Sequence, residues 1–512
     1  MATRTGNSIL NVKVAISFYC VNLVLQFVSR KIFLDYLGSE VMGLNTTAQN
    51  LLGFLNIAEM GLGTAVAYNL YSPLYHQDRK AIVDIVSVQG WLYKQVATFV
   101  IVGSIVLMVF FPVIFAKAEI PMWYTYTTFI AFLVSSLLGY YVNYRQIVLS
   151  ADQKEYKITI CTKGGMAIKV VAQIIAVLFL EHGYEAWIAI EIVSAIAISL
   201  MLNRTINKEY PWLHPDTRAG KALKNDYPQI IKKTKQVFFH KIGGFVLTQM
   251  SPLVIYGFTT LTLVAAYGNY MIIVMGISAL MNALLNGIGA SIGNLVAEGD
   301  KDRIMSGFWK VTFIRIWLAS IICFCFYESG DDLITLWVGA EYILPHATFA
   351  VLIVNTFLTY TRTNDAFLAA YGLYQDIWAP LVEASLNIGF SIMLGYYWGI
   401  TGVLLGATIS LLTIISCWKP YFLFRYGFKE KLWEYVSRYA KYILLTLLSW
   451  WAAGYLCRLI ISNASDTVVR WVYQTIVMAL AYAFCSMTIF CIGDRYPRFY
   501  ARWALQVLKS RL

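Results

Sequence analysis

Long apolar segments occupy most of this chain and leave few folds open to it. A helix needs about 20 apolar residues to cross a bilayer. About fourteen such segments occur, at residues 9–29, 43–70, 85–115, 121–149, 158–180, 184–203, 236–258, 262–297, 304–327, 343–371, 377–398, 400–424, 438–460 and 468–492. Only 13% of the residues are charged, whereas a soluble domain carries about 25%. The sequence therefore predicts an all-α integral membrane protein.

Loop charges predict the orientation of these segments. Basic residues follow the even-numbered segments at Arg79, Lys80, Lys154, Lys157, Lys301, Arg303, Lys429 and Lys431, with more between residues 204 and 235 and in the C-terminal tail. Fewer follow the odd-numbered segments, at Arg30, Lys31, Lys117, Arg458 and Arg470. Cytoplasmic loops carry the excess of Lys and Arg, so we expect both termini in the cytoplasm. The loop at 372–376, which has no basic residue, is the one exception.

The sequence also repeats itself. GLGTA at 61–65, ahead of DRKAI at 78–82, is echoed by GIGAS at 287–291 ahead of DKDRI at 300–304, and Tyr144-Arg145 by Tyr360-Thr-Arg362. The common order predicts two parallel six-helix repeats, an arrangement in which transporters place a site between the repeats. The expected domains are an N-terminal six-helix bundle (1–207), a basic cytoplasmic linker (208–235), a C-terminal six-helix bundle (236–427), and two additional transmembrane helices with a cytoplasmic tail (428–512).

The stretch from 43 to 82 combines apolar character with polar groups. It contains Glu59 next to two close glycines, Gly61 and Gly63, and ends in a charged loop. A carboxylate in a membrane-crossing helix usually faces a protein interior or a water-filled cavity, and nearby glycines permit a bend or a close helix contact. A bent, polar-striped membrane helix of this kind is typical of transporters.

This stretch resembles the second helix of the multidrug/oligosaccharidyl-lipid/polysaccharide (MOP) exporter superfamily, and within it the Wzx-type polysaccharide flippases. The pattern consists of a Gly-Leu start, an NLLGFL core, an EMGLGTA bend and LYSPL before the charged turn. Three later pieces resemble the second half of the same family, LWVG at 336–339, GLY at 372–374 and GITGVLLG at 399–406. The resemblance covers nearly the whole chain.

The resemblance implies a non-enzymatic flippase of the bacterial inner membrane. It would move a lipid-linked oligosaccharide of the undecaprenyl-diphosphate type by alternating access about a central cavity, for O-antigen, capsule or exopolysaccharide biosynthesis. The expected partners are that substrate and membrane lipids, together with a polysaccharide polymerase and a chain-length regulator. No cofactor is expected beyond coupling to H⁺ or Na⁺. The alternatives are a cation-coupled multidrug exporter of the same superfamily and a membrane oligosaccharide polymerase or ligase.

Basic residues inside the apolar segments are the candidates for substrate binding. They are Arg145, Arg362, Lys169, Lys94, Lys310, Arg315 and Lys241. The planar guanidinium of arginine binds phosphate through two hydrogen bonds, so together these residues predict a cationic cavity for a diphosphate. The alternative for each is that its side chain extends to the lipid headgroups or forms a structural ion pair.

Acidic residues inside the segments are candidates for cation coupling. Glu59 and Asp365 are the two that we select, and Glu191 and Glu383 are also intramembrane. A buried carboxylate can exchange a proton near neutral pH. The alternative is again structural, because Arg362 and Asp365 are three residues apart and neutralise each other on one helix face.

Other chemistries have little support in the sequence. The eight cysteines form no C-x-x-C pair and lie mostly in apolar runs, which predicts buried apolar packing and no metal site. The five histidines show no ligand spacing, and no phosphate-binding loop of ATPases occurs. The net charge of +12 is explained by cytoplasmic loops, so no nucleic-acid partner is expected.

Overall fold

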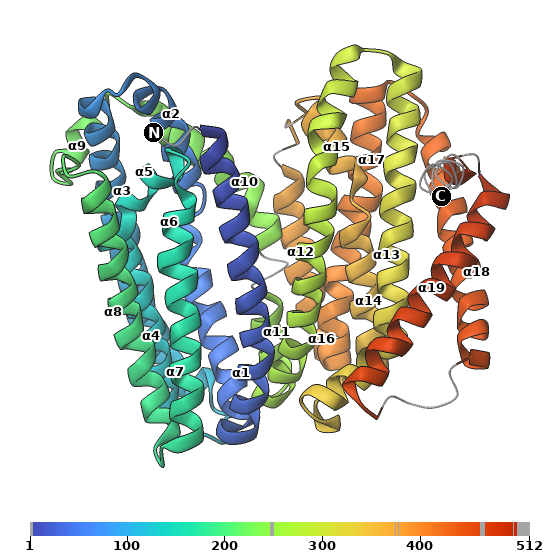
Figure 1. The fold of residues 1–512 in the computed structure, drawn as a ribbon, viewed down its shortest axis with the longest axis horizontal. Coiled ribbons are helices and arrows are strands. Elements are labelled where there is room, and N and C mark those ends of the chain that lie inside the picture. Colours follow the sequence, from blue (N-terminus) through green and yellow to red (C-terminus); the bar gives the residue numbers. More distant parts are fainter. Residues whose placement is uncertain are drawn as a thin grey trace. The chain divides into compact units, whose positions relative to one another are not determined.

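The computed structural model describes residues 4–245, 250–373, 375–376, 378–460, 466–494 and 496–498. The described residues are helical with no strand, and they form two compact units, Met1–Gly268 and Asn269–Leu512 (Figure 1). The prediction of an all-α protein is confirmed. The predicted domain boundaries stay predictions; the division between the units falls inside α12.

The first unit contains the helices up to the start of α12. They are α1 (Arg4–Leu55), the 3₁₀ turn η1 (Asn56–Glu59), α2 (Leu62–His76), α3 (Arg79–Ile114), α4 (Met122–Tyr141), the 3₁₀ turn η2 (Asn143–Arg145), α5 (Gln146–Ala151), α6 (Glu155–Thr159), the π-helix η3 (Ile160–Gly164), α7 (Gly165–Phe179), α8 (Gly183–Glu209), α9 (Gly220–Leu223), α10 (Pro228–Phe245), α11 (Ser251–Phe258) and α12 (Leu261–Glu298). Helix α1 packs on α4 and α7, α8 packs on α4 and α7, and α2 packs on α3 and α10.

The second unit contains the remaining helices. They are α13 (Lys301–Trp337), the 3₁₀ turn η5 (Ala340–Tyr342), α14 (His346–Tyr360), α15 (Thr363–Ala370), α16 (Trp378–Ser410), the π-helix η6 (Leu411–Trp418), α17 (Lys419–Phe422), the π-helix η7 (Leu423–Phe428), α18 (Leu432–Ile460) and α19 (Val468–Gly493). Helix α14 packs on α13 and α16, and the last two helices pack on each other and on α13. The two helices that the sequence predicts to be additional to the repeats are therefore integral to this unit.

Ten helices among the described residues are long and apolar enough to cross a membrane. Two of them, Leu10–Glu59 and Trp378–Phe428, each cover two of the predicted segments. The predicted segments 236–258 and 343–371 are helical in shorter pieces, apart from residues 246–249, which lie outside the described part. The chain is thus a multi-pass membrane protein, and the number of crossings stays a prediction.

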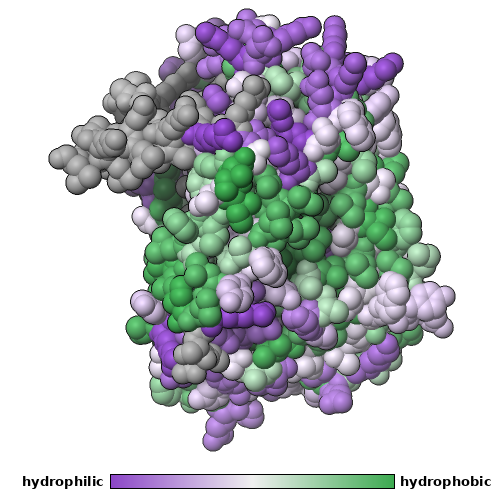
Figure 2. Space-filling view, turned by 90° about the vertical axis from the view of Figure 1, so that its right-hand side faces the viewer, coloured by the Kyte–Doolittle hydropathy of each residue, from purple (hydrophilic) through white to green (hydrophobic). Residues whose placement is uncertain are grey.

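The molecular surface has the distribution that a bilayer requires. Figure 2 shows hydrophobic residues across the middle of one face, with hydrophilic residues toward both ends.

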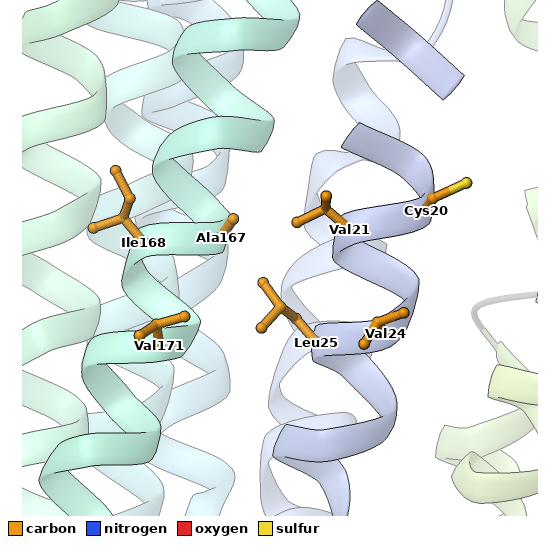
Figure 3. A pocket seen from close by; sticks show the side chains of 7 residues that line it. All are labelled: Cys20, Val21, Val24, Leu25, Ala167, Ile168 and Val171. Atoms are coloured by element: carbon orange, nitrogen blue, oxygen red, sulfur yellow. The ribbon is translucent and has the colours of Figure 1, made fainter. Parts of the chain in front are cut away.

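In the first unit, a shallow groove between α1 and α7 is lined by apolar residues alone: Cys20, Val21, Val24, Leu25, Ala167, Ile168 and Val171 (Figure 3). Cys20 and Cys417 are exposed, so the prediction of buried cysteines is wrong for these two.

Arg30 lies inside α1 and not in the loop that the sequence predicted. Helix α1 continues through this region and has its break at Gly38. Arg30 is 7% exposed, and its Nη2 donates a hydrogen bond to the Ala265 carbonyl at 2.8 Å. The adjacent charges of Arg30 and Lys31 in an otherwise apolar stretch suggest a loop, but here a backbone carbonyl of a helix distant in sequence accepts a hydrogen bond from Arg30.

The GITGVLLG motif forms the second arm of a helical hairpin. Gly399 has φ +55°, a value that favours glycine, and it interrupts α16. Gly402 and Gly406 then pack directly against the backbone of Leu394 and Ser391, where a side chain would collide. The Ser391 hydroxyl also donates to the Val403 carbonyl at 2.8 Å. Small residues four apart permit this close approach of two helices.

The echoed DRKAI and DKDRI motifs have the same structural role in the two units. Asp78 caps α3 by accepting a hydrogen bond from Ala81 N, and Asp300 caps α13 by accepting from Asp302 N and Arg303 N. Ile82 and Ile304, four residues after each cap, are buried. An aspartate at this position satisfies free N–H groups at the helix start. Each unit thus supports the repeat locally, while the repeat layout as a whole stays a prediction.

A network of charges fixes the turn that precedes α6. The Lys154 ammonium lies 2.7 Å from Asp152 Oδ2 and 2.7 Å from Glu209 Oε1. Burial alone would lower the pKa of Lys154, but the hydrogen bonds and charges of the two carboxylates outweigh it and raise the pKa. This loop lysine, which sequence analysis used only for orientation, therefore connects the α5–α6 turn to the end of α8.

Candidate functional site

The predicted bend beside Glu59 is present in the first unit. Helix α1 ends at Leu55, η1 follows, and Gly61 has φ +93° before α2 begins. Glycine is needed here for a second reason as well, because a Cβ at Gly61 would lie 2.8 Å from the Thr234 carbonyl oxygen of α10. The break therefore directs the Glu59 side chain away from a regular helix and is held in place by α10.

A polar cavity of about 300 Å³ lies at this break. It is lined by Asn56, Glu59, Gln89, Tyr93, Ser135, Ser136, Gly139, Tyr140, Tyr144, Gln146 and Ile147. Two helix breaks contribute to the wall, η1 between α1 and α2 and η2 between α4 and α5. Breaks in membrane helices expose polar backbone and side chains at places where transporters bind ligands. We call this cavity the Glu59 pocket.

Hydrogen bonds hold the side chains of the Glu59 pocket in place. The Tyr93 hydroxyl donates to Glu59 Oε1 at 2.9 Å. Asn56 Oδ1 accepts from the hydroxyls of Ser136 and Tyr140, at 3.1 and 2.9 Å. The sequence prediction singled out Glu59 but missed Tyr93 and Tyr140, because both lie in helices distant in sequence and their residue types are common in this chain.

Arg145 and Lys94 do not line the Glu59 pocket. Arg145 lies in η2, where its Nη1 donates to the Leu213 carbonyl at 3.1 Å and its Nη2 donates to Asn203 Oδ1. Lys94 Nζ donates to Thr217 Oγ1 at 2.5 Å. Both side chains therefore point to α8 or to the segment after it, and their predicted role in substrate binding stays untested.

Lys169 forms a buried ion pair inside the first unit. Its Nζ lies 2.8 Å from Glu191 Oε1, and Gln173 Nε2 donates to Glu191 Oε2 at 2.9 Å. The side chains of Lys169 and Glu191 are 19% and 7% exposed. Lys169 therefore forms a structural ion pair, which is the alternative to substrate binding that the sequence left open. Its charge is already offset by Glu191 on α8.

A double-mutant cycle on this pair is expected to separate stability from transport. Glu191→Leu leaves the Lys169 charge uncompensated and should lower the free energy of unfolding by about 3–5 kcal/mol. Adding Lys169→Met should restore most of this loss, because no charge then remains buried. Thermal unfolding of the detergent-solubilised protein measures both effects. If the stable double variant fails in transport, Lys169 contacts the substrate as first predicted.

A second cluster of charges lies at the break between α14 and α15. Asp365 binds two cations, Arg362 Nε at 2.8 Å and Lys419 Nζ at 2.5 Å. Glu383, on α16, is 3% exposed and has one carboxyl oxygen without a hydrogen-bond partner. Arg315 is half-buried, and its Nε atom is buried without a hydrogen-bond partner. We call Arg315, Arg362, Asp365, Glu383 and Lys419 the Arg362 cluster.

The Arg362 cluster contains three basic and two acidic groups and therefore favours an anion. Arg362 donates a hydrogen bond from Nε to Asp365, so the N–H groups on its two terminal nitrogens remain as donors. Sequence analysis missed Lys419, although a single lysine within the apolar run 400–424 was a usable signal. Lys310 lies on α13 and has an interaction partner of its own. The Lys241 side chain lies outside the described part of the structure.

Comparisons with known proteins identify the fold. The likeness to two solved structures shows that this multi-pass membrane protein has the fold of MOP superfamily transporters. An inward-facing MATE family multidrug resistance transporter of the MOP superfamily has a TM-score of 0.60 at 13% identity, over 82% of this chain and 98% of that one. The lipid II flippase MurJ, in an inward closed conformation, has a TM-score of 0.63 at 12% identity, over 94% and 100%.

The other two comparisons gave no match. No protein-family model matches the sequence, and no curated protein is significantly similar. The predicted MOP fold is thus confirmed by structure alone, while the Wzx-type assignment stays a prediction.

Proposed function

We propose that this protein is a flippase for a lipid-linked oligosaccharide in the bacterial inner membrane. The observation that carries the proposal is the Arg362 cluster, with its excess of basic groups and free guanidinium donors. A diphosphate needs such donors when it leaves water. The likeness to the lipid II flippase MurJ, which extends over 94% of this chain, supports a lipid-linked substrate.

The mechanism that we propose is alternating access. The diphosphate and glycan enter a polar cavity from the cytoplasmic leaflet, while the lipid tail remains in the bilayer. Glu59 couples the change of access to a proton gradient. The charged carboxylate needs polar surroundings and the protonated carboxyl does not, so binding of a proton favours a different conformation of the cavity. Both termini lie in the cytoplasm, and a polymerase and a chain-length regulator use the exported product.

The multidrug exporter remains the second candidate function, for one specific reason. The Glu59 pocket has an acidic group and no basic side chain among its lining residues, and this charge suits a cationic drug. The fold likeness to the MATE family transporter is compatible with the same function. A glycosyl-transferring enzyme has no such support, since both structures named above are transporters or flippases.

Deletion of the gene in its own host is expected to separate the two functions. A flippase mutant should lose its surface polysaccharide and accumulate lipid-linked oligosaccharide that externally added lectin cannot reach in intact spheroplasts. A gel of surface polysaccharide and a lectin-binding assay measure the two quantities. Normal surface polysaccharide combined with raised sensitivity to cationic dyes would instead identify a drug exporter.

A further inference from the structure

The Glu59 pocket has a chemistry that differs from that of the Arg362 cluster. Its polar lining side chains are a carboxylate, hydroxyls and amides, joined by Gly139 and the apolar Ile147, and none of the lining residues is basic. Three of these oxygens, on Glu59, Asn56 and Tyr93, are already oriented by hydrogen bonds. A phosphate would meet the negative charge of Glu59 here without a compensating cation. The pocket is therefore built for a ligand that donates hydrogen bonds and carries no negative charge.

The size of the pocket narrows the choice of ligand. A volume of about 300 Å³ equals the share of roughly ten water molecules in the liquid. A metal ion needs several oxygen ligands at about 2.3–2.6 Å, and among the described residues no group of three or more His, Cys, Asp or Glu side chains could hold one. A polyhydroxylated ring of several carbon and oxygen atoms fills such a space and presents donors in several directions.

Two tyrosines give the pocket an apolar face. The rings of Tyr93 and Tyr140 lie with their centroids 5.5 Å apart and an angle of 34° between their planes. Both side chains are almost fully buried, at 6% and 4% exposed, so the two rings pack against each other as a rigid part of the pocket wall. The hydroxyls of both rings are bound to Glu59 and Asn56 respectively, which fixes the rings before a ligand arrives.

We propose that the Glu59 pocket binds one sugar ring of the glycan while the diphosphate is bound elsewhere. This inference rests on the proposed function and adds a specificity site to it. Glu59 and Asn56 bind sugar hydroxyls, and the tyrosine pair contacts the ring. Discrimination comes from these polar groups, because a buried acceptor left unpaired by the wrong sugar weakens binding.

Gly139 allows a direct test of this site. It lines the pocket from α4, and a Cβ added there meets no atom within 4 Å. Gly139→Ala and Gly139→Leu therefore add progressively more volume at the pocket wall, starting from a Cβ that meets open space. Both changes improve helix propensity by up to about 1 kcal/mol. Gly454 on α18 is the matched control, since its Cβ also meets open space and it lies outside the pocket.

The assay uses the full-length protein in nanodiscs and saturation-transfer NMR. The probe is the phosphate-free oligosaccharide that mild acid releases from the host's own lipid-linked intermediate. Wild type and Gly454→Leu should bind it equally. Gly139→Leu should weaken binding at least tenfold, with Gly139→Ala intermediate, while none of the variants has a melting temperature below that of the wild type.

Three results would overturn the proposal. The first is equal binding of the glycan by Gly139→Leu and wild type. The second is a wild-type protein that binds the intact lipid-linked oligosaccharide but not the phosphate-free glycan, which refutes the sugar site and leaves the proposed function standing. The third is a wild type that binds neither and whose deletion leaves surface polysaccharide unchanged, in which case the proposed function fails as well.

Discussion

Arg362→Ala is expected to lower translocation of the lipid-linked oligosaccharide by roughly tenfold to a hundredfold. Hydrogen bonds to a charged group contribute about 1.5–3 kcal/mol, and each 1.4 kcal/mol is tenfold in affinity. Proteoliposomes loaded with the host's lipid-linked oligosaccharide measure the rate through its exposure to external lectin. Arg362→Lys should restore only part of the rate, because a point charge replaces the planar fork of donors.

A companion variant separates substrate binding from neutralisation of Asp365. If Arg362 only neutralises this carboxylate, the double variant Arg362→Ala/Asp365→Asn should recover wild-type transport. If Arg362 binds the diphosphate, the double variant stays inactive. Arg303→Ala is the control for loss of an arginine, since Arg303 is 71% exposed at the start of α13. Wild-type rates in Arg362→Ala would remove this residue from the site.

Glu59→Gln is expected to uncouple transport from the pH gradient. The amide keeps the size of the side chain and resembles the protonated carboxyl, so folding should be unchanged. The groups that face Glu59 are the tyrosines of the pocket, Tyr93, Tyr140 and Tyr144, together with the amides of Asn56 and Gln89. A proton shifts the equilibrium between two conformations only if they differ in proton affinity. A side chain that cannot titrate removes that shift.

The measurement compares two modes of transport in the same vesicles. Net transport driven by an imposed pH gradient should fall at least about tenfold in Glu59→Gln, corresponding to a loss of 1.4 kcal/mol or more of coupling. Exchange of substrate without a gradient should fall much less, because the amide oxygen of glutamine can still accept a hydrogen bond from the sugar but the side chain cannot titrate. Normal gradient-driven transport in this variant would show that Glu59 is only a structural partner of Tyr93. The next candidate for coupling would then be Asp365, whose two carboxylate oxygens pair with the side chains of Arg362 and Lys419.

The sequence was informative about features that depend on residues near one another in the chain. The predicted bend at Gly61 depends on a local glycine next to a polar group, and the structure places a 3₁₀ turn and a left-handed residue there. The pairing of Arg362 with Asp365 follows from their spacing of three residues, and the structure has it at 2.8 Å, with Arg362 just before α15 and not on a continuous helix face. Such features need no knowledge of how helices pack.

Hydrophobicity alone determined that this chain is an all-α membrane protein, because a bilayer leaves few ways to satisfy the backbone. Only the tertiary structure decided which intramembrane charges meet. Lys169 forms an ion pair with Glu191 on the next helix, and Asp365 forms one with Lys419 on α17. Tyr93, on α3, donates a hydrogen bond to Glu59. Helix rotation and register set these contacts, and apolar helices pack in many registers at similar cost. The sequence therefore predicted which side chains carry charge, and packing determined whether each charge is paired inside a unit or left with donors and acceptors for a ligand.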